Sequence, residues 1–309
     1  MARRKKGKAV HGWLILDKPV GMTSTQAVGA VRRLFDARKA GHAGTLDPLA
    51  TGLLPIALGE ATKTVPYAVD GTKHYRFTVR WGAATDTDDA EGRLTQTSEL
   101  RPSRAAIEAL LPRFTGEILQ VPPAFSAIKV AGARAYDLAR EGEIVKLEPR
   151  PVHIEKLELL EIPDPDTAVF RAQCGKGTYV RALARDMGAA LGCLGHLIAL
   201  RRTRVAAFQE AQAVTLDALE KAAQGDGDDG VYRFLLPVEA ALQELPMVPV
   251  GQNDAARLLR GQAVLMRGRD APVGSGPAYA TCKGHLIAVG RIDKGELHPV
   301  RTFNFSNPR

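Results

Sequence analysis

The sequence predicts an α+β fold: a mixed, largely antiparallel sheet with flanking helices, followed by a small β-rich domain. Apolar and polar residues alternate along 74–81 and again along 168–174, which is the period of strands with one apolar face. Strand and helix patterns follow one another without a regular strand–helix–strand rhythm, which disfavours a parallel sheet. Glycines and short strand-like pieces after residue 246 predict the second, β-rich part.

The remaining elements of the larger part follow from local patterns. Ser24, Ser103 and Thr178 each precede apolar residues at helical spacing, so each is predicted to begin a helix. Gly192 lies just past the end of the third helix, as glycine commonly does. A strand around 152–162 is expected before the proline-containing connection that leads to 168–174.

Charge and flexibility divide the chain. Residues 1–9 hold five basic side chains and predict a flexible tail. The polar run AAQGDGDDG at 222–230 predicts a flexible break. Residues 250–309 carry nine basic and four acidic side chains, a net charge of +5. We therefore expect a main domain over 10–245 and a small basic domain over 246–309.

Composition excludes several classes of protein. The chain has 309 residues and a net charge of +8, which favours a polyanionic partner. No apolar run reaches the roughly 18 residues that a membrane span needs, and no apolar segment follows the basic N-terminus, so we expect a cytoplasmic protein without membrane contact. Three scattered cysteines, Cys174, Cys193 and Cys282, predict neither a disulfide framework nor a zinc site.

One loop draws attention as a candidate site. Asp47 precedes a proline within the segment 41–52, which contains three glycines. Such a loop can hold a short acidic side chain among small residues that leave room for a ligand. An aspartate before proline is also typical of a simple turn, so the local pattern leaves both interpretations open.

The wider pattern resembles the TruB family of tRNA pseudouridine synthases. Seven stretches carry the resemblance, in family order over about residues 11–208: DKPVGMTS at 17–24, GHAGTLDPLATGLLPI at 41–56, KHY at 73–75, GAATDTDDAEG at 82–92, PPAFSA at 122–127, GKGTYVRALARDMG at 175–188 and LRRT at 200–203. Trp81 and Ala206 depart from the family pattern, which has an aliphatic residue and a glycine there.

The resemblance implies a pseudouridine synthase fold and an isomerisation of uridine to pseudouridine at position 55, in the T loop of tRNA. It assigns Asp47 as the catalytic nucleophile, Arg181 as its ion-pair partner and Tyr75 as the ring that stacks on the flipped base. It implies no metal and no organic cofactor. Attack of the aspartate at C1′, attack at C6 and assistance to a glycal intermediate all remain open.

The resemblance also implies substrate-binding residues. His42 would fill the stack that the flipped base vacates, since a stacked base must leave the helix to react. Tyr179 and Leu200 would border the base, and Lys18 would brace the catalytic loop beside the substrate. Arg202, within the basic cluster 201–204, would meet phosphate.

Residue patterns alone offer plainer interpretations of the same positions. Tyr75 and Leu200 also fit core positions, Arg181 a solvated helix charge, and His42 a local hydrogen bond. The acidic run 86–89 fits a solvated turn or, through its closely spaced carboxylates, a hard-metal site.

The implied partner is the T-arm stem-loop of tRNA, bound by a monomer without an obligate protein partner and with a PUA-like C-terminal domain. A non-catalytic tRNA-binding or folding factor is the main alternative, because it needs the basic surface but not the carboxylate. A guide-RNA-dependent relative would carry a fuller C-terminal domain. A hydrolase that depends on an aspartate would require a second well-placed carboxylate.

Overall fold

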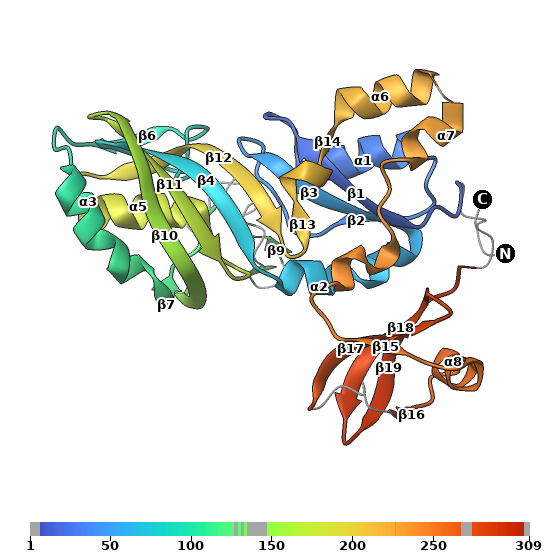
Figure 1. The fold of residues 1–309 in the computed structure, drawn as a ribbon. Coiled ribbons are helices and arrows are strands. Elements are labelled where there is room, and N and C mark those ends of the chain that lie inside the picture. Colours follow the sequence, from blue (N-terminus) through green and yellow to red (C-terminus); the bar gives the residue numbers. More distant parts are fainter. Residues whose placement is uncertain are drawn as a thin grey trace.

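The computed structural model describes residues 7–126, 129–130, 133–134, 147–225, 227–266 and 274–305. They form a large mixed sheet with helices on its faces and a separate small sheet near the C-terminus (Figure 1). This is the α+β architecture that the sequence predicts. In this part of the chain, no helix has both the length and the apolar character needed to cross a membrane.

Ten strands of the described chain form the large sheet. Eight lie in the order β14-β1-β3-β12-β4-β11-β10-β7, while β2 pairs with β3 and β13 with β12. Only the β1–β14 and β3–β12 pairs are parallel. The bounds are β1 (Gly12–Lys18), β2 (Ala40–His42), β3 (Thr51–Leu58), β4 (Lys73–Trp81), β7 (Gly116–Gln120), β10 (Arg150–Asp164), β11 (Thr167–Cys174), β12 (Gly195–Val205), β13 (Phe208–Gln209) and β14 (Val214–Thr215).

Short hairpins and helices complete the main part. Two two-stranded pairs are β5 (Ala83–Thr85) with β6 (Leu94–Thr97) and β8 (Lys129–Val130) with β9 (Ala133–Arg134). The helices are α1 (Ser24–Leu34), η1 (Gly59–Lys63), α2 (Val65–Asp70), α3 (Arg104–Leu110), η2 (Leu111–Phe114), α5 (Val180–Ala190), η3 (Glu210–Gln212), α6 (Leu216–Gly225), α7 (Gly227–Tyr232) and η4 (Val238–Leu242).

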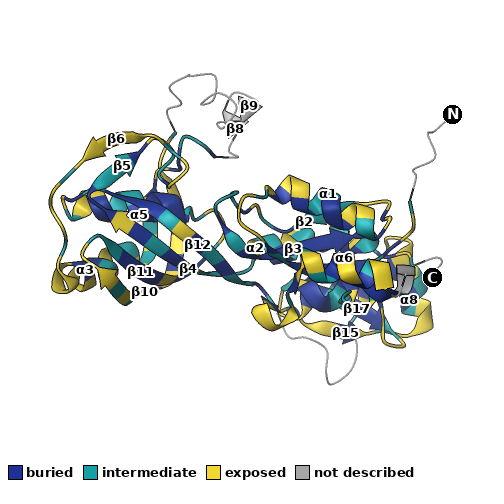
Figure 2. Ribbon diagram, turned by 90° about the horizontal axis from the view of Figure 1, so that it is seen from above, coloured by how far each residue is buried: buried dark blue, intermediate teal, exposed yellow. Residues whose placement is uncertain are grey.

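The alternating segments form the centre of the sheet. Strands β4 and β11 pair antiparallel along their whole length, from Lys73 opposite Cys174 to Arg80 opposite Thr167. The rings of Phe77 and Phe170 stack with centroids 5.4 Å apart. The period of two therefore predicts these strands correctly, because one face of each is buried (Figure 2).

Two of the three predicted helix starts are shifted by one residue. Thr23, not Ser24, caps α1: its hydroxyl accepts from the Gln26 amide at 3.1 Å, and the Gln26 side chain accepts from the Thr23 amide. Ser24 instead exchanges two hydrogen bonds with the backbone of Leu46, which fastens α1 to the loop that holds Asp47.

Helix α5 begins after Tyr179, and the Thr178 hydroxyl donates to the carbonyl of Gly175. Thr178 is therefore not the residue that caps the helix. Ser103 does cap α3, as predicted.

The predicted flexible break at 222–230 is wrong for the described residues. Helix α6 runs to Gly225 and α7 starts at Gly227. Leu219 and Ala222 are buried in the main core, where α6 lies against α1. Packing of these two residues stabilises α6 up to Gly225.

Residues 1–6 of the predicted N-terminal tail lie outside the described residues. Lys8, which also belongs to that predicted tail, forms a β-bridge with Ala37.

The C-terminal part is a five-stranded sheet with one helix. The strand order is β15-β17-β18-β19-β16. It packs its own small core, to which Leu258 of the helix contributes. The bounds are β15 (Met247–Pro249), α8 (Gln252–Leu259), β16 (Val264–Leu265), β17 (Gly276–Cys282), β18 (His285–Asp293) and β19 (Glu296–Thr302).

A hydrogen-bonded clasp, formed by Glu60 and Lys63 of η1, holds the end of the C-terminal sheet against the main part. Lys63 Nζ donates to the Thr302 carbonyl at 2.8 Å and lies above the Phe303 ring. Glu60 accepts from Lys63 at 2.6 Å and from the Asn304 amide at 2.9 Å. Since Phe303 is buried together with core residues of the main part, the two parts share a packed seam.

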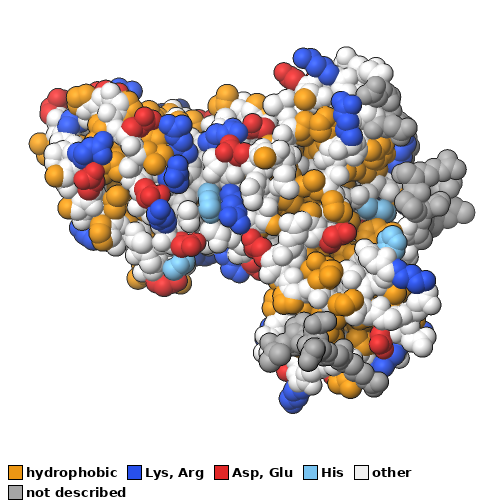
Figure 3. Space-filling model, in the orientation of Figure 1, with side chains coloured by type: hydrophobic (Ala, Val, Ile, Leu, Met, Phe, Trp, Pro, Cys, Tyr) orange, Lys and Arg blue, Asp and Glu red, His pale blue; other side chains and the backbone are white. Residues whose placement is uncertain are grey.

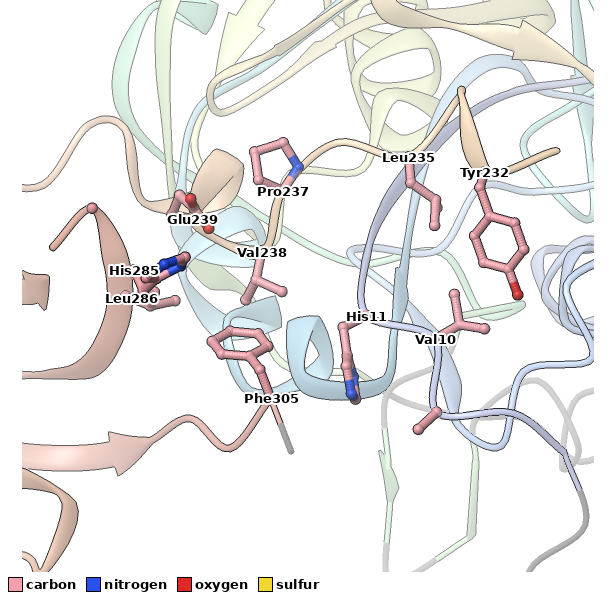
Figure 4. Close-up of a pocket in the computed structure, with 12 residues that line it drawn as sticks. Val10, His11, Tyr232, Leu235, Pro237, Val238, Glu239, His285, Leu286 and Phe305 are labelled. Atoms are coloured by element: carbon pink, nitrogen blue, oxygen red, sulfur yellow. The ribbon is translucent and has the colours of Figure 1, made fainter. Parts of the chain in front are cut away.

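A cavity of about 280 Å³ opens along the same seam (Figure 4). His11, Val238, His285 and Phe305 are among the residues that line it. The His11 ring meets the Phe305 ring edge-on at 5.8 Å, and its Nδ1 accepts from the Glu60 amide. Burial lowers the pKa of His11, which favours the neutral ring that can accept this hydrogen bond.

Candidate active site

Asp47 lies in the loop between β2 and β3, and two glycines allow the shape of that loop. Gly44 has a φ of +100° and Gly52 a φ of +95°, in the left-handed region that glycine adopts readily. A Cβ atom added to Gly52 would lie 2.2 Å from the Arg202 carbonyl oxygen, so β3 and β12 approach as closely as they do because this residue has no side chain.

The structure brings Asp47 and Arg181 together, as the family resemblance implies. Arg181 Nε lies 2.9 Å from Asp47 Oδ2. The Arg181 side chain is 6% exposed and the Asp47 side chain 34% exposed. A buried guanidinium therefore holds a carboxylate that solvent, and hence a ligand, can reach.

The other nitrogens of Arg181 are fixed by backbone. Nη1 donates to the Thr87 carbonyl at 3.0 Å and Nη2 to the Phe125 carbonyl at 2.8 Å. A second carboxylate, from Asp89, lies 3.6 Å from Nε and is only 4% exposed. Two carboxylates on one cation keep this buried charge compensated.

Within the acidic run 86–89, Asp88 and Asp89 therefore belong to this network of arginines, whereas Asp86 is exposed. Asp88 accepts from Arg185 Nη1 at 2.8 Å. Burial raises the pKa of the Asp88 carboxyl, and the charge of Arg185 opposes that rise. Among the described residues, no group of three or more His, Cys, Asp or Glu side chains could hold a metal ion.

Sequence reasoning missed Asp89 and Arg185 as parts of the site. Arg181 and Arg185 are four residues apart on α5, so they lie on one face of the helix. Arg185 also donates to the Val121 carbonyl at 2.8 Å. The helical spacing of two arginines, together with a nearby acidic run, is the signal that could have identified this network.

Lys18 links the start of the chain after β1 to the Asp47 loop. Its side chain is buried, and Nζ donates to the carbonyls of Pro19 at 2.9 Å, Met22 at 2.7 Å and Pro48 at 3.4 Å. Burial lowers the pKa of Lys18 to about 8, while the charge of Asp47 raises it. The bracing role fits this geometry, whereas the fully buried ammonium is not placed at the surface of the site.

Arg202 differs most from its expected position. The residue is 1% exposed, and its guanidinium donates to three backbone carbonyls of the Asp47 loop region: Gly44, Thr45 and Leu53. A side chain buried in this way cannot reach a phosphate group. The expectation of a phosphate contact does not agree with the structure, because β12 directs this side chain under the loop.

The neighbouring arginines of the cluster are engaged with carboxylates. Arg201 pairs with Asp17 at 3.0 Å and with Glu210 at 2.7 Å. Arg204 lies 3.6 Å from Glu244. Acidic and basic side chains are also interspersed over the face drawn in Figure 3. The cluster 201–204 is thus largely compensated within the protein.

Tyr75 and His42 both lie near Arg202. Tyr75 is directly opposite Arg202 in the β4–β12 pair, and burial raises the pKa of its hydroxyl, while the charge of Arg202 opposes the rise. His42 is half-buried at the end of β2. Burial, together with the charge of Arg202, lowers its pKa, so the ring is neutral near pH 7.

Tyr179 and Leu200 occupy different surroundings. Gln120 holds the backbone of Tyr179, accepting from its amide at 2.8 Å and donating to its carbonyl at 3.2 Å. Burial raises the pKa of the Tyr179 hydroxyl. Leu200 is 8% exposed and belongs to the main core opposite Phe77. Core packing therefore accounts for most of its surface.

Two family descriptions match this chain. Residues 32–180 match the N-terminal domain of TruB family pseudouridylate synthase, and residues 181–243 match the tRNA pseudouridylate synthase B C-terminal domain.

Two curated relatives span nearly the whole chain. The tRNA pseudouridine synthase B of Bradyrhizobium diazoefficiens is 61% identical over 307 residues, which are 98% of this chain and 88% of that protein. That of Chelativorans sp. is 55% identical over 310 residues, covering 98% and 99%.

Two solved structures contain chains of similar fold. The crystal structure of a Cbf5-Nop10-Gar1 complex contains a chain that matches with a TM-score of 0.73 and 27% identity, over 95% of this chain and 84% of that chain. A structure of an H/ACA RNP bound to a substrate RNA containing 2′-deoxyuridine matches with a TM-score of 0.73 and 24% identity, over 100% and 92% of the two chains, and shows the same fold. On these sequence and structural matches, the chain belongs to the TruB family of pseudouridylate synthases.

Proposed function

We propose that this protein isomerises uridine 55 in the T loop of tRNA to pseudouridine, with Asp47 as the catalytic nucleophile. The observation that carries the proposal is the Asp47–Arg181 ion pair, in which a partly exposed carboxylate is held by a buried cation at 2.9 Å. A nucleophilic or charge-stabilising carboxylate must remain ionised, and an adjacent guanidinium favours that form. Membership of the family and relatives named tRNA pseudouridine synthase B support the choice of tRNA.

The reaction is balanced without a co-substrate. The bond from C1′ to N1 breaks, the uracil turns within the site, and a bond from C1′ to C5 forms. The proton on C5 is lost and N1 gains one, so the product has the same atoms as the substrate. Asp47 is required only to stabilise or bond the reacting ribose or base and is released at the end.

Neighbouring residues have roles in holding the flipped nucleotide. Tyr75 stacks on the uracil, and Tyr179 and Leu200 border it. His42, neutral and at the edge of the loop, occupies the space that the base leaves in the RNA. Lys18 links the segment that follows β1 to the loop that carries Asp47, through the carbonyls of Pro19 and Met22 on one side and Pro48 on the other.

The protein acts as a cytoplasmic monomer without an obligate protein partner, and the C-terminal sheet serves as a PUA-like contact for tRNA. Sequence identity of 53–61% to relatives named tRNA pseudouridine synthase B favours independent action on tRNA over a guide-RNA-dependent role within a larger particle. The chain with 27% identity in the Cbf5-Nop10-Gar1 complex shares the fold with lower sequence identity.

The test is tritium release from tRNA labelled at C5 of uracil, with wild type and Asp47→Asn compared at saturating enzyme. Wild type should release label from position 55, and Asp47→Asn should bind tRNA while its rate falls at least roughly 10³-fold. A tRNA carrying cytidine at position 55 is the substrate control. Full release by Asp47→Asn would overturn the assigned role.

The same assay distinguishes an enzyme from the alternative, a non-catalytic tRNA-binding or folding factor. A tRNA-binding or folding factor would bind tRNA through the same surface but release no label, even as wild type. A wild-type protein with that behaviour would replace the catalytic proposal with the folding role.

A further inference from the structure

We propose that Arg202 is a positioning residue that ties the Asp47 loop to the strand carrying Tyr75, and so fixes how the carboxylate and the ring meet one nucleotide. The proposal rests on the proposed function, in which both of those side chains engage the uridine. It replaces the expected phosphate contact with a role that never touches RNA.

The contacts to the loop join its two ends. Nη2 of Arg202 donates to the Gly44 carbonyl at 3.0 Å and Nη1 to the Thr45 carbonyl at 3.3 Å, both before Asp47. Nε donates to the Leu53 carbonyl at 2.8 Å, after Asp47. One planar group therefore spans the loop, and all three of its nitrogens are used.

The contact to Tyr75 comes from strand pairing. Arg202 and Tyr75 are direct partners in the antiparallel β12–β4 pair, and the charge of the guanidinium opposes the rise that burial causes in the pKa of the phenol. Arg202 is also the partner of Gly52 in the parallel β12–β3 pair. A single residue thus connects the strand after the nucleophile to the strand of the stacking ring.

Burial indicates that this role is geometric. Arg202 is 1% exposed, so a phosphate cannot approach its charge. Its loop acceptors are three carbonyl oxygens that lie around one planar fork, a shape that guanidinium matches and an ammonium does not. Lysine at this position keeps the charge but cannot make the same set of contacts.

The proposal predicts a change in catalytic rate without a matching change in binding. Displacement of a reacting group by about 1 Å can lower a rate roughly 100-fold. We expect Arg202→Lys to lower kcat by roughly 10- to 100-fold while KM for tRNA changes less than about threefold. The matched control is Arg201→Lys, on the same strand, where the side chain pairs with Asp17 and Glu210; its kcat should stay within about threefold of wild type.

Two further measurements separate positioning from general damage to the fold. In Arg202→Ala, added guanidinium ion, but not sodium ion, should restore part of kcat, because the ion can occupy the vacated space. In a Tyr75→Phe background, Arg202→Lys should lower kcat by a smaller factor than it does in wild type, because the phenol hydroxyl on which Arg202 acts is already absent. Thermal unfolding of each variant checks that it folds.

The outcomes are distinct. A rise in KM with unchanged kcat would assign Arg202 to RNA binding and overturn the proposal, as would wild-type kinetics or an equal cost in both Tyr75 backgrounds. If wild type itself releases no label, the proposed function fails regardless of Arg202. If Asp47→Asn is inactive while Arg202→Lys is fully active, only the positioning role fails.

Discussion

Asp47 and Asp89 approach the same nitrogen, Arg181 Nε, at 2.9 and 3.6 Å. Their exposure separates their roles: the Asp47 side chain is 34% exposed and that of Asp89 only 4%. Asp89 is held further by the Glu91 amide, which donates to its Oδ1 at 3.0 Å. One carboxylate is thus open to solvent, while the other is buried beside the cation.

Asp89→Asn should lower kcat by about 10- to 100-fold, because Arg181 would lose the buried charge that holds it and would shift relative to Asp47. Binding of tRNA should change little. Single-turnover tritium release measures the rate. Asp86→Asn is the control, since Asp86 is exposed in the same run and accepts from the Arg93 amide. An unchanged rate for Asp89→Asn would show that Asp89 does not help to position Arg181.

Gly52, at the start of β3 beside the Asp47 loop, should be far less replaceable than Gly21. Gly52→Ala combines a φ of +95° with a Cβ contact of 2.2 Å to the Arg202 carbonyl, so it should lower the free energy of unfolding by more than about 3 kcal/mol. Gly21→Ala has a φ of +81° but open space, so it should cost only about 1–2 kcal/mol. Urea denaturation measures both, and similar losses would contradict the proposed close approach of the strands.

Lys18 should make folding stability depend on pH in the alkaline range. Its pKa is lowered from the ordinary lysine value of 10.5 to about 8, so between these values the unfolded chain binds more protons than the folded one. The contribution of Lys18 to stability is therefore fully present above pH 10.5 and is lost as the pH falls through about 8.

The unfolding free energy of wild type minus that of Lys18→Met should become more positive by about 1–2 kcal/mol from pH 7.5 to 9.5. Denaturant titrations at the two pH values measure this. Lys156→Met, at an exposed position, is the control and should give a difference that does not vary. A constant difference for Lys18→Met as well would contradict the lowered pKa.

The clasp between η1 and the C-terminal sheet should matter for large substrates only. Lys63→Met removes the donor to Thr302 and the partner of Glu60, so the C-terminal sheet would lose its fixed orientation. We expect full-length tRNA to bind roughly 5- to 10-fold more weakly, since 1.4 kcal/mol corresponds to a factor of ten. A T-arm stem-loop shortened until it makes no contact with that sheet should react as before. An equal loss with both substrates would mean that the clasp supports the main part instead.

The sequence predicts the strands better than the network that they carry. The alternation around Phe77 and Phe170 identifies β4 and β11 because each strand buries one face. The helical residues of α6 at 222–225 escape prediction, because the packing of Leu219 and Ala222 on distant segments is not visible in the local sequence.

For the candidate site, the family resemblance identified a pair of residues that the local sequence pattern could not identify. Nothing near Asp47 in the sequence shows that an arginine 134 positions later faces it, and the resemblance placed that pair correctly. Arg202 was misplaced, because burial of an arginine depends on carbonyl acceptors that come from a loop about 150 residues earlier. A charged residue within an arginine-rich run predicts surface by default.

Strand β12 adds a constraint on how the chain can vary. Leu200 and Arg202 are buried while Arg201, between them, lies on the opposite side. The pairing with β4 is regular from Ala199 to Arg202, so removing one residue within that stretch would exchange inward and outward positions, and the Arg202 guanidinium would turn from the Asp47 loop toward solvent. A point substitution there changes single contacts, whereas an insertion or deletion would disconnect the loop from the sheet in one step, so the length of this stretch of β12 is more constrained than its composition.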